Sequence, residues 1–104
     1  MLSNGQPDYK VGYLPAAKQQ IQDIAAGATD HGQRKALASA LRSALAKLQT
    51  EPSTWGDPEY NLNKPGGCVY HGIIEPMIIT YAIYEHERVV LITSVRLLPP
   101  PTRD

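Results

Sequence analysis

The sequence predicts an α+β domain in which a helical hairpin packs on a curved, mainly antiparallel sheet. Three observations predict this class: a short alternating stretch at 9–14, two stretches with apolar residues at helical spacing, and three β-branched runs after residue 67. The chain has 104 residues, and a single core commonly serves about 100–150 residues. We therefore expect one domain over 1–104, with flexible termini at 1–8 and 99–104.

The first strand and the first helix follow one another directly. Residues 9–14 read YKVGYL, in which Tyr and Val side chains alternate with the others, as in a half-buried strand. Pro15 then suits the first position of a helix, because the N–H that it lacks is not needed there. Gly27 is the natural end of the helical pattern that follows.

A second helix is predicted from about 33 to 49 by a stripe of leucines on one side. These leucines are Leu37, Leu41, Leu45 and Leu48. Asp30 or Thr29 can cap the helix, and Pro52 lies just beyond its end. The short segment ATDHG joins the two helices, so they are expected to form an antiparallel hairpin.

The second half of the chain predicts a loop and then three strands. Glycine and proline recur from 51 to 67, which indicates a surface loop with a short strand at 59–62. The β-branched and aromatic runs of an antiparallel meander follow at 68–74, 77–84 and 88–98. Consecutive prolines then remove N–H donors, so the last strand should end near Leu98.

Charge and cysteine content limit the classes of protein to which the chain could belong. Ten basic and ten acidic residues cancel, so the chain as a whole lacks a cationic field for indiscriminate binding of nucleic acid or membrane. No apolar run reaches the ~20 residues that span a bilayer. Cys68 is the single cysteine and cannot form an internal disulfide. We expect a soluble cytoplasmic protein.

Three segments carry a resemblance to a known family. They are YKVGYLPAAKQQI at 9–21, the leucine-striped second helix, and ITYAIYEHERVVLITSV at 79–95. In these segments the chain resembles the RelE/ParE superfamily of bacterial toxin components. The resemblance implies the toxin of a toxin–antitoxin pair, held inactive by an antitoxin protein. Its target would be messenger RNA on the ribosome or, in the ParE branch, DNA gyrase.

The resemblance also implies where an RNA-cleaving site would lie. The family's second-strand lysines fall near His71 and Ile73, and its third-strand arginine falls on Ile78. Its last-strand arginine falls close to Leu98, whereas this chain has Arg96 two residues earlier. The chain would then be an mRNA endoribonuclease that lacks most of the usual Lys and Arg set. A non-catalytic protein-binding or nucleic-acid-binding module of the same fold is the alternative.

His71 is the first candidate catalytic residue. An imidazole can give or take a proton near neutral pH, which suits general acid–base chemistry. Regular alternation would place His71 on one face of its strand with Val69 and Ile73, where it could equally be a hydrogen-bonded interior histidine. Its exposure to solvent separates these two interpretations.

Arg96 is the second candidate catalytic residue. Alternation places it with Ile92 and Ser94 on one face of the last strand, where a guanidinium could bind phosphate. A surface arginine without function is the competing interpretation. Tyr84 and Lys64 are predicted as secondary contacts to nucleic acid or to a partner.

The helix at 33–49 offers a further binding surface. Lys35 and Arg42 lie opposite its leucine stripe and could meet nucleic acid or an acidic antitoxin segment. A solvated helix face without a binding role is the competing interpretation. Cys68 and His71 are three apart in a strand and so point to opposite faces, and we propose neither a metal site nor a cofactor. The strands at 77–84 and 89–98 would support a homodimer if one edge were free.

Overall fold

The computed structural model of the protein describes residues 8–28, 30–61 and 67–99. Its elements are β1 (Lys10–Tyr13), α1 (Pro15–Gly27), α2 (His31–Thr50), α3 (Pro52–Trp55), β2 (Asp57–Asn61), β3 (Gly67–Ile74), β4 (Met77–Tyr84) and β5 (Val89–Leu97). The segments predicted as flexible, 1–8 and 99–104, lie almost wholly outside the described residues. No described helix has the length and apolar content that crossing a membrane requires.

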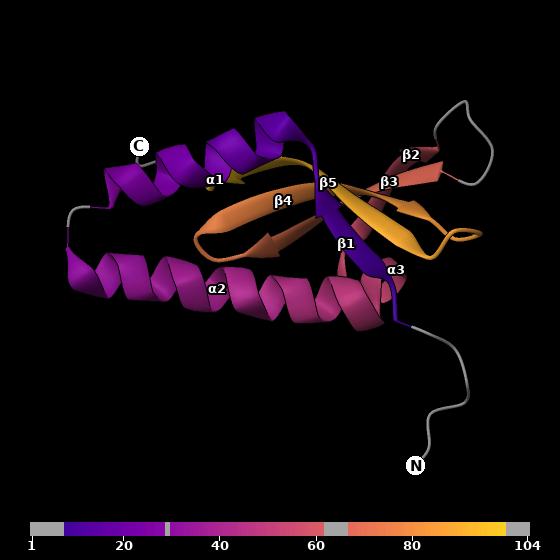
Figure 1. Ribbon diagram of the computed structural model, residues 1–104, viewed down its shortest axis with the longest axis horizontal. Coiled ribbons are helices and arrows are strands. Elements are labelled where there is room, and N and C mark those ends of the chain that lie inside the picture. Colours follow the sequence, from indigo (N-terminus) through magenta and orange to yellow (C-terminus); the bar gives the residue numbers. More distant parts are fainter. Residues whose placement is uncertain (1–7, 29, 62–66, 100–104) are drawn as a thin grey trace, which may run out of the picture.

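The fold is α+β, as the sequence predicts. One five-stranded sheet has the order β1-β5-β4-β3-β2, in which β1 runs parallel to β5 and the other neighbours are antiparallel. Helices α1 and α2 both pack on one face of this sheet (Figure 1). No described helix covers the other face, which we call the open face, although Val69 and Ala82 on it are buried. The predicted meander is therefore β3, β4 and β5, at the centre of the sheet.

Local signals set the helix ends. Pro15 occupies the first turn of α1. The Asp30 carboxylate accepts a hydrogen bond from the Gln33 backbone N–H at 2.8 Å, so Asp30 is the cap of α2. Because the cap precedes the helix, α2 begins at His31, two residues before the predicted start. The other predicted cap, Thr29, lies outside the described residues.

The loop predicted at 51–67 contains more structure than expected. It begins with the single turn α3 and continues as β2, which pairs with β3 across a bulge between Pro58 and Tyr60. The short strand predicted at 59–62 thus exists but begins two residues earlier. The glycines and prolines of this segment predict a loop, so the helical turn and the full length of the strand were not predicted. Both elements depend on contacts with distant residues rather than on local propensity.

The core lies between the helices and one face of the sheet. The buried set is Tyr9, Ala17, Ala44, Leu48, Met77, Ile79, Tyr81, Ile83, Val90, Ile92 and Val95. Alternate residues of β4 supply the centre of this set, and small alanines let both helices approach the sheet closely. Each large aliphatic side chain buried in this way stabilises the fold by about 1.5–3 kcal/mol.

The first strand closes one edge of the sheet. It pairs with the first half of β5. In the second half of β5, the Val95 backbone N–H donates to the Gln20 side-chain oxygen of α1 at 2.7 Å. The Tyr9 hydroxyl donates to Glu85 at 2.7 Å, and the Arg88 guanidinium lies 4.0 Å from the Tyr9 ring centroid. Strand β4 is interior, so the strand edges left within the described residues are those of β1, β2 and the second half of β5, which β1 does not reach.

Candidate functional site

The open face of the sheet carries one row of polar side chains. Cross-strand register aligns Asp57 with His71, His71 with Thr80, and Thr80 with Ser94. We call these four residues the polar row. The neighbouring positions on this face are mostly apolar, as at Ile73 and Ile78 in the next row. The polar row therefore crosses four strands, although it is scattered over 38 positions in the sequence.

A bulge in β5 brings Ser94 and Arg96 to the open face. Tyr81 pairs with Ile92 while Thr80 pairs with Ser94, so one extra residue stands between them on β5. Ile92 is fully buried against the helices. The prediction that Ile92 shares a face with Ser94 and Arg96 is wrong, because simple alternation takes no account of the bulge.

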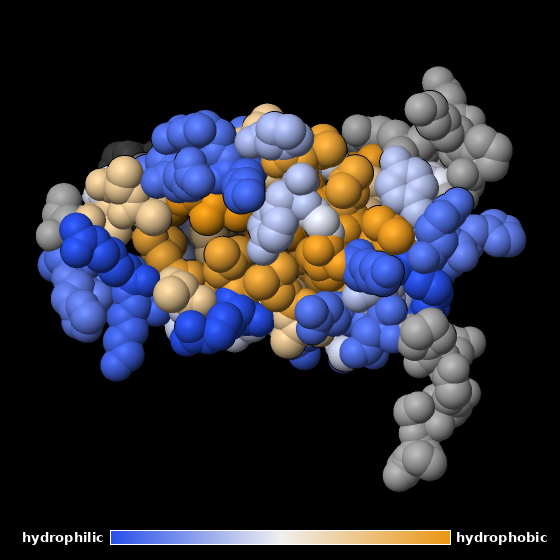
Figure 2. Space-filling view, viewed as in Figure 1, coloured by the Kyte–Doolittle hydropathy of each residue, from blue (hydrophilic) through white to orange (hydrophobic). Residues whose placement is uncertain are grey.

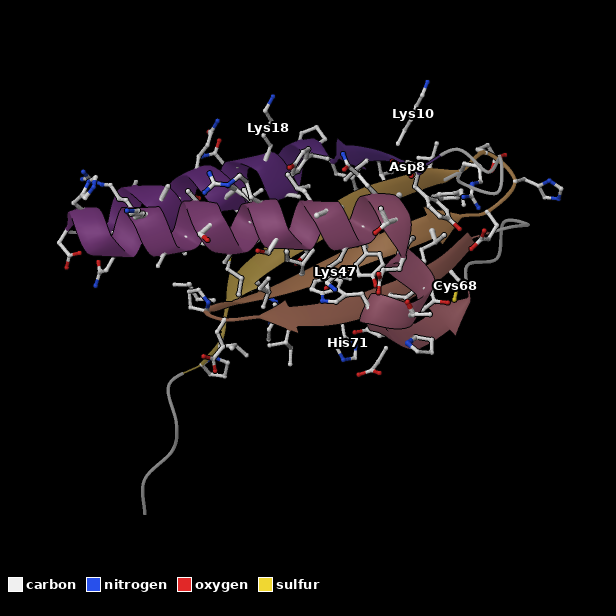
Figure 3. The ribbon with its side chains drawn as sticks, turned by 90° about the horizontal axis from the view of Figure 1, so that it is seen from below. Asp8, Lys10, Lys18, Lys47, Cys68 and His71 are labelled. Carbon is white, nitrogen blue, oxygen red and sulfur yellow. The ribbon has the colours of Figure 1, made fainter. Side chains whose placement is uncertain are left out.

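His71 projects from the sheet on the side away from α2 (Figure 3). Its side chain is 35% exposed, so the interior-histidine interpretation does not hold. Its Nδ1 atom is itself buried and lies 2.7 Å from the Glu59 Oε2 atom. The contact is a close ion pair when His71 is protonated, but the carboxylate is not aligned with the ring as a hydrogen-bond acceptor. Sequence reasoning missed Glu59 because the bulge in β2 determines where it points.

Arg96 is exposed and pairs with Ile78, one row away from the polar row. It lies two strands and one row from His71, which places the two backbones roughly 12 Å apart. Tyr84 is half-buried at the far end of β4, beside Val89. The structure thus brings His71 and Arg96 to one face but not into contact, and it leaves Tyr84 at the margin.

The aromatic residues at the end of the helical layer are committed to packing. The Tyr81 ring stacks between Trp55 and Tyr70, with centroid distances of 5.8 and 5.6 Å. The Tyr81 hydroxyl donates to the Pro52 carbonyl at 2.6 Å, and burial raises the pKa of Tyr81 well above its usual range. Trp55 lies so close to Gly72 that no side chain fits there. These rings are not exposed stacking platforms for bases.

The other predicted binding residues lie elsewhere. Lys35 and Arg42 are exposed on α2, as predicted, but α2 covers the opposite face of the sheet from His71. They therefore form a separate surface. Lys64 lies outside the described residues. Cys68 and His71 point to opposite faces of β3, and the described residues contain no group of three side chains that could hold a metal.

A groove runs between α1 and α2 on the helical side. Two adjoining cavities of about 540 and 280 Å³ share Ile24 and Leu37 in their walls. Figure 2 shows apolar atoms along the groove between polar helix faces. Leu97, at the end of β5, reaches it with a side chain that is 52% exposed. We call this feature the interhelical groove.

The leucine stripe lies on one side of α2, as predicted, and faces the core and the interhelical groove. Only Leu48, at the end near α3, is fully buried, whereas Leu37, Leu41 and Leu45 are half-buried. These three leucines pack against the core, and Leu37 and Leu41 also line the groove. The spacing of the leucines predicts the apolar side of α2 but not the distance between the two helices.

Comparison with known proteins assigns the fold. No family model matches the chain, and no curated protein matches it in sequence. Solved structures do match. The toxin–antitoxin complex RelBE2 of Mycobacterium tuberculosis contains a chain that is 18% identical, with a TM-score of 0.63 over 91% of this chain and 97% of that one. The chain has the RelE/ParE fold.

Two further structures agree with the RelE/ParE fold. A chain of the archaeal RelE–RelB complex of Pyrococcus horikoshii OT3 is 13% identical, with a TM-score of 0.58 over 89% of this chain and 98% of that one. A chain of the chromosomal ParDE TA system of P. aeruginosa is 12% identical, with a TM-score of 0.62 over 88% and 97%. At these identities the likeness defines the architecture and leaves activity to be argued from the residues.

Proposed function

We propose that the protein is the toxin component of a toxin–antitoxin pair. The interhelical groove is the observation that carries this proposal. An apolar groove that is open to solvent is typical of a surface that another protein covers. Structures with the same fold come from a toxin–antitoxin complex and from a RelE–RelB complex. A partner that fills the groove would be the antitoxin.

The charge of α2 indicates what kind of segment would bind there. From His31 to Thr50 the helix carries four Lys or Arg residues and no Asp or Glu. Arg34 lines the groove itself, and Lys35 and Arg42 are exposed nearby on the same helix. An amphipathic partner segment with an apolar face and acidic flanks would complement this surface.

The activity that we propose is cleavage of messenger RNA at the polar row. His71 would take the proton of a 2′-hydroxyl, O2′ would form a bond to the adjacent phosphorus, and the bond from phosphorus to O5′ would break. The leaving O5′ takes a proton from water, which gives a 2′,3′-cyclic phosphate and a 5′-hydroxyl. Arg96 would bind the phosphate, while Tyr84 and Lys64 remain predicted secondary contacts.

A specific observation favours a second candidate, a non-catalytic binding module. Strands β3, β4 and β5 contain one Arg and no Lys, so the part of the open face around His71 offers little cationic stabilisation to a phosphate undergoing attack. Ile73 and Ile78 stand in the row of Arg96, where further basic residues would be useful. A protein that acts on DNA gyrase would not need such groups either.

Expression of the chain alone in a bacterial host tests the proposal. Growth is followed together with incorporation of labelled amino acid, thymidine and uridine. We expect growth arrest in which translation fails first, with rescue by the double variant His71→Ala, Arg96→Ala. Arrest in which DNA synthesis fails first would point to gyrase. Unimpaired growth with folded protein would favour the non-catalytic module.

A paired substitution tests the role of the groove. Ala38 lines the groove and Ser39 is exposed beside it on α2 without lining it. Protein segments that restore growth are selected from a library against the toxic chain. Ala38→Glu should escape such suppressors while remaining toxic, whereas Ser39→Glu should stay suppressible. Equal suppression of both variants would place the partner elsewhere on the molecule.

A further inference from the structure

The contact between Glu59 and His71 assigns a proton to one atom of the imidazole ring. The Nδ1 atom is buried, and the Glu59 Oε2 atom lies 2.7 Å from it. The carboxylate is not aligned as a hydrogen-bond acceptor, so the contact acts through charge. If Nδ1 were unprotonated, two electron-rich atoms would lie 2.7 Å apart, which is repulsive. A proton on Nδ1 turns the same contact into an attraction.

The position of the proton on Nδ1 determines what the rest of the ring presents. A neutral imidazole with Nδ1 protonated has its free lone pair on Nε2. The side chain stands on the open face, in line with Thr80 and Ser94. Glu59 lies at the bulge of β2, the edge strand of the sheet, and its carboxylate contacts the ring at Nδ1.

We propose that Glu59 is a positioning residue that keeps His71 in the Nδ1–H tautomer and presents Nε2 to a ligand on the open face. The inference rests on the proposed function for the class of that ligand, a ribonucleotide chain with a hydroxyl beside a phosphodiester. A negative carboxylate beside Nδ1 favours the proton on that nitrogen and leaves Nε2 as the proton acceptor of the neutral ring.

Ring-nitrogen NMR on the full-length protein tests the tautomer directly. Spectra that correlate ring carbon-bound protons with ¹⁵N distinguish a protonated from a bare nitrogen, and are recorded at about pH 8, where free imidazole is neutral. The wild type should show His71 protonated at Nδ1. In Glu59→Ala, which removes an exposed side chain, the proton should move to Nε2, the tautomer that histidine prefers in water.

Controls are available within the chain. The exposed His31 and His86 should keep the same tautomer in every variant, and Glu75→Ala removes an exposed carboxylate from the turn after β3. A His71 ring already protonated at Nε2 in the wild type would overturn the proposal. So would a tautomer that Glu59→Ala leaves unchanged.

An activity measurement separates failure of this inference from failure of the proposed function. If Glu59→Ala switches the tautomer of His71, its rate of RNA cleavage should fall about tenfold or more, because Nε2 can then no longer accept the proton. Glu75→Ala should keep the wild-type rate. Full cleavage by a tautomer-switched variant would overturn the catalytic part of the inference. If the wild type does not cleave RNA, the proposed function fails. The NMR measurement still shows whether Glu59 determines the tautomer of His71.

Discussion

Removal of the Tyr81 hydroxyl should destabilise the protein measurably. Tyr81 is fully buried, and its hydroxyl donates to the Pro52 carbonyl at 2.6 Å. Tyr81→Phe keeps the ring stack with Trp55 and Tyr70 but removes this donor. Loss of a buried hydrogen bond that leaves its partner without a donor costs about 1–3 kcal/mol.

This cost should depend on pH in a defined direction. Burial raises the pKa of Tyr81, whereas a tyrosine in the unfolded chain titrates near pH ~10. Below about pH 10 the hydroxyl is protonated in both states and contributes no pH dependence. Above it the unfolded chain loses the proton first, so the free energy of unfolding of the wild type falls as pH rises. Tyr81→Phe has no hydroxyl to titrate at this position. The difference in the free energy of unfolding between wild type and variant should therefore become smaller as pH rises.

Thermal unfolding at about pH 8 and about pH 11 measures both effects. A loss of 1 kcal/mol lowers the melting temperature of a domain of this size by roughly 4–8 °C. Tyr84→Phe, on the opposite face of β4, serves as the matched control and should change stability by less than about 0.5 kcal/mol. Part of the fall in the free energy of unfolding at alkaline pH should remain in every variant. It comes from three other tyrosines whose pKa values are raised, Tyr9, Tyr13 and Tyr70. Equal stability of Tyr81→Phe and wild type at pH 8, or a cost that grows at pH 11, would refute the reasoning.

Three further substitutions test the packing of the fold. Gly72→Ala should destabilise by about 1–3 kcal/mol, because the added methyl overlaps the ring of Trp55, and the tryptophan fluorescence should report its displacement. Asp30→Ala should cost about 1 kcal/mol in chemical denaturation through loss of the α2 cap, and no loss would mean that another group caps the helix. Tyr9→Phe should raise hydrogen exchange at the β4–β5 turn by freeing Glu85, whereas unchanged exchange would show that the hydroxyl does not tie the turn down.

Local signals in the sequence predict much of the fold. Pro15, Asp30 and the leucine stripe predict both helices within a few residues. The β-branched runs predict β3, β4 and β5, and Glu75 with Pro76 separates the first two of these strands. These elements could be predicted because each depends on its own residues for propensity, capping and alternation.

The parts that could not be predicted depend on how distant segments meet. The parallel pairing of β1 with β5 joins residues as distant in sequence as Lys10 and Val89, and no local pattern encodes it. The β5 bulge shifts Ser94 and Arg96 by one position, so alternation counted through Ile92 gave the wrong companions. The partner of His71 was missed for the same reason, because Glu59 points to it from a second bulge.

We propose that the chain is a toxin that cleaves messenger RNA through the open face of its sheet. Translation of a reporter messenger in a bacterial extract, with purified protein added, tests this activity most directly. We predict that the wild type stops synthesis and leaves messenger fragments with 5′-hydroxyl ends, and that His71→Ala, Arg96→Ala does neither. Unimpaired translation and intact messenger with folded wild-type protein would contradict the claim.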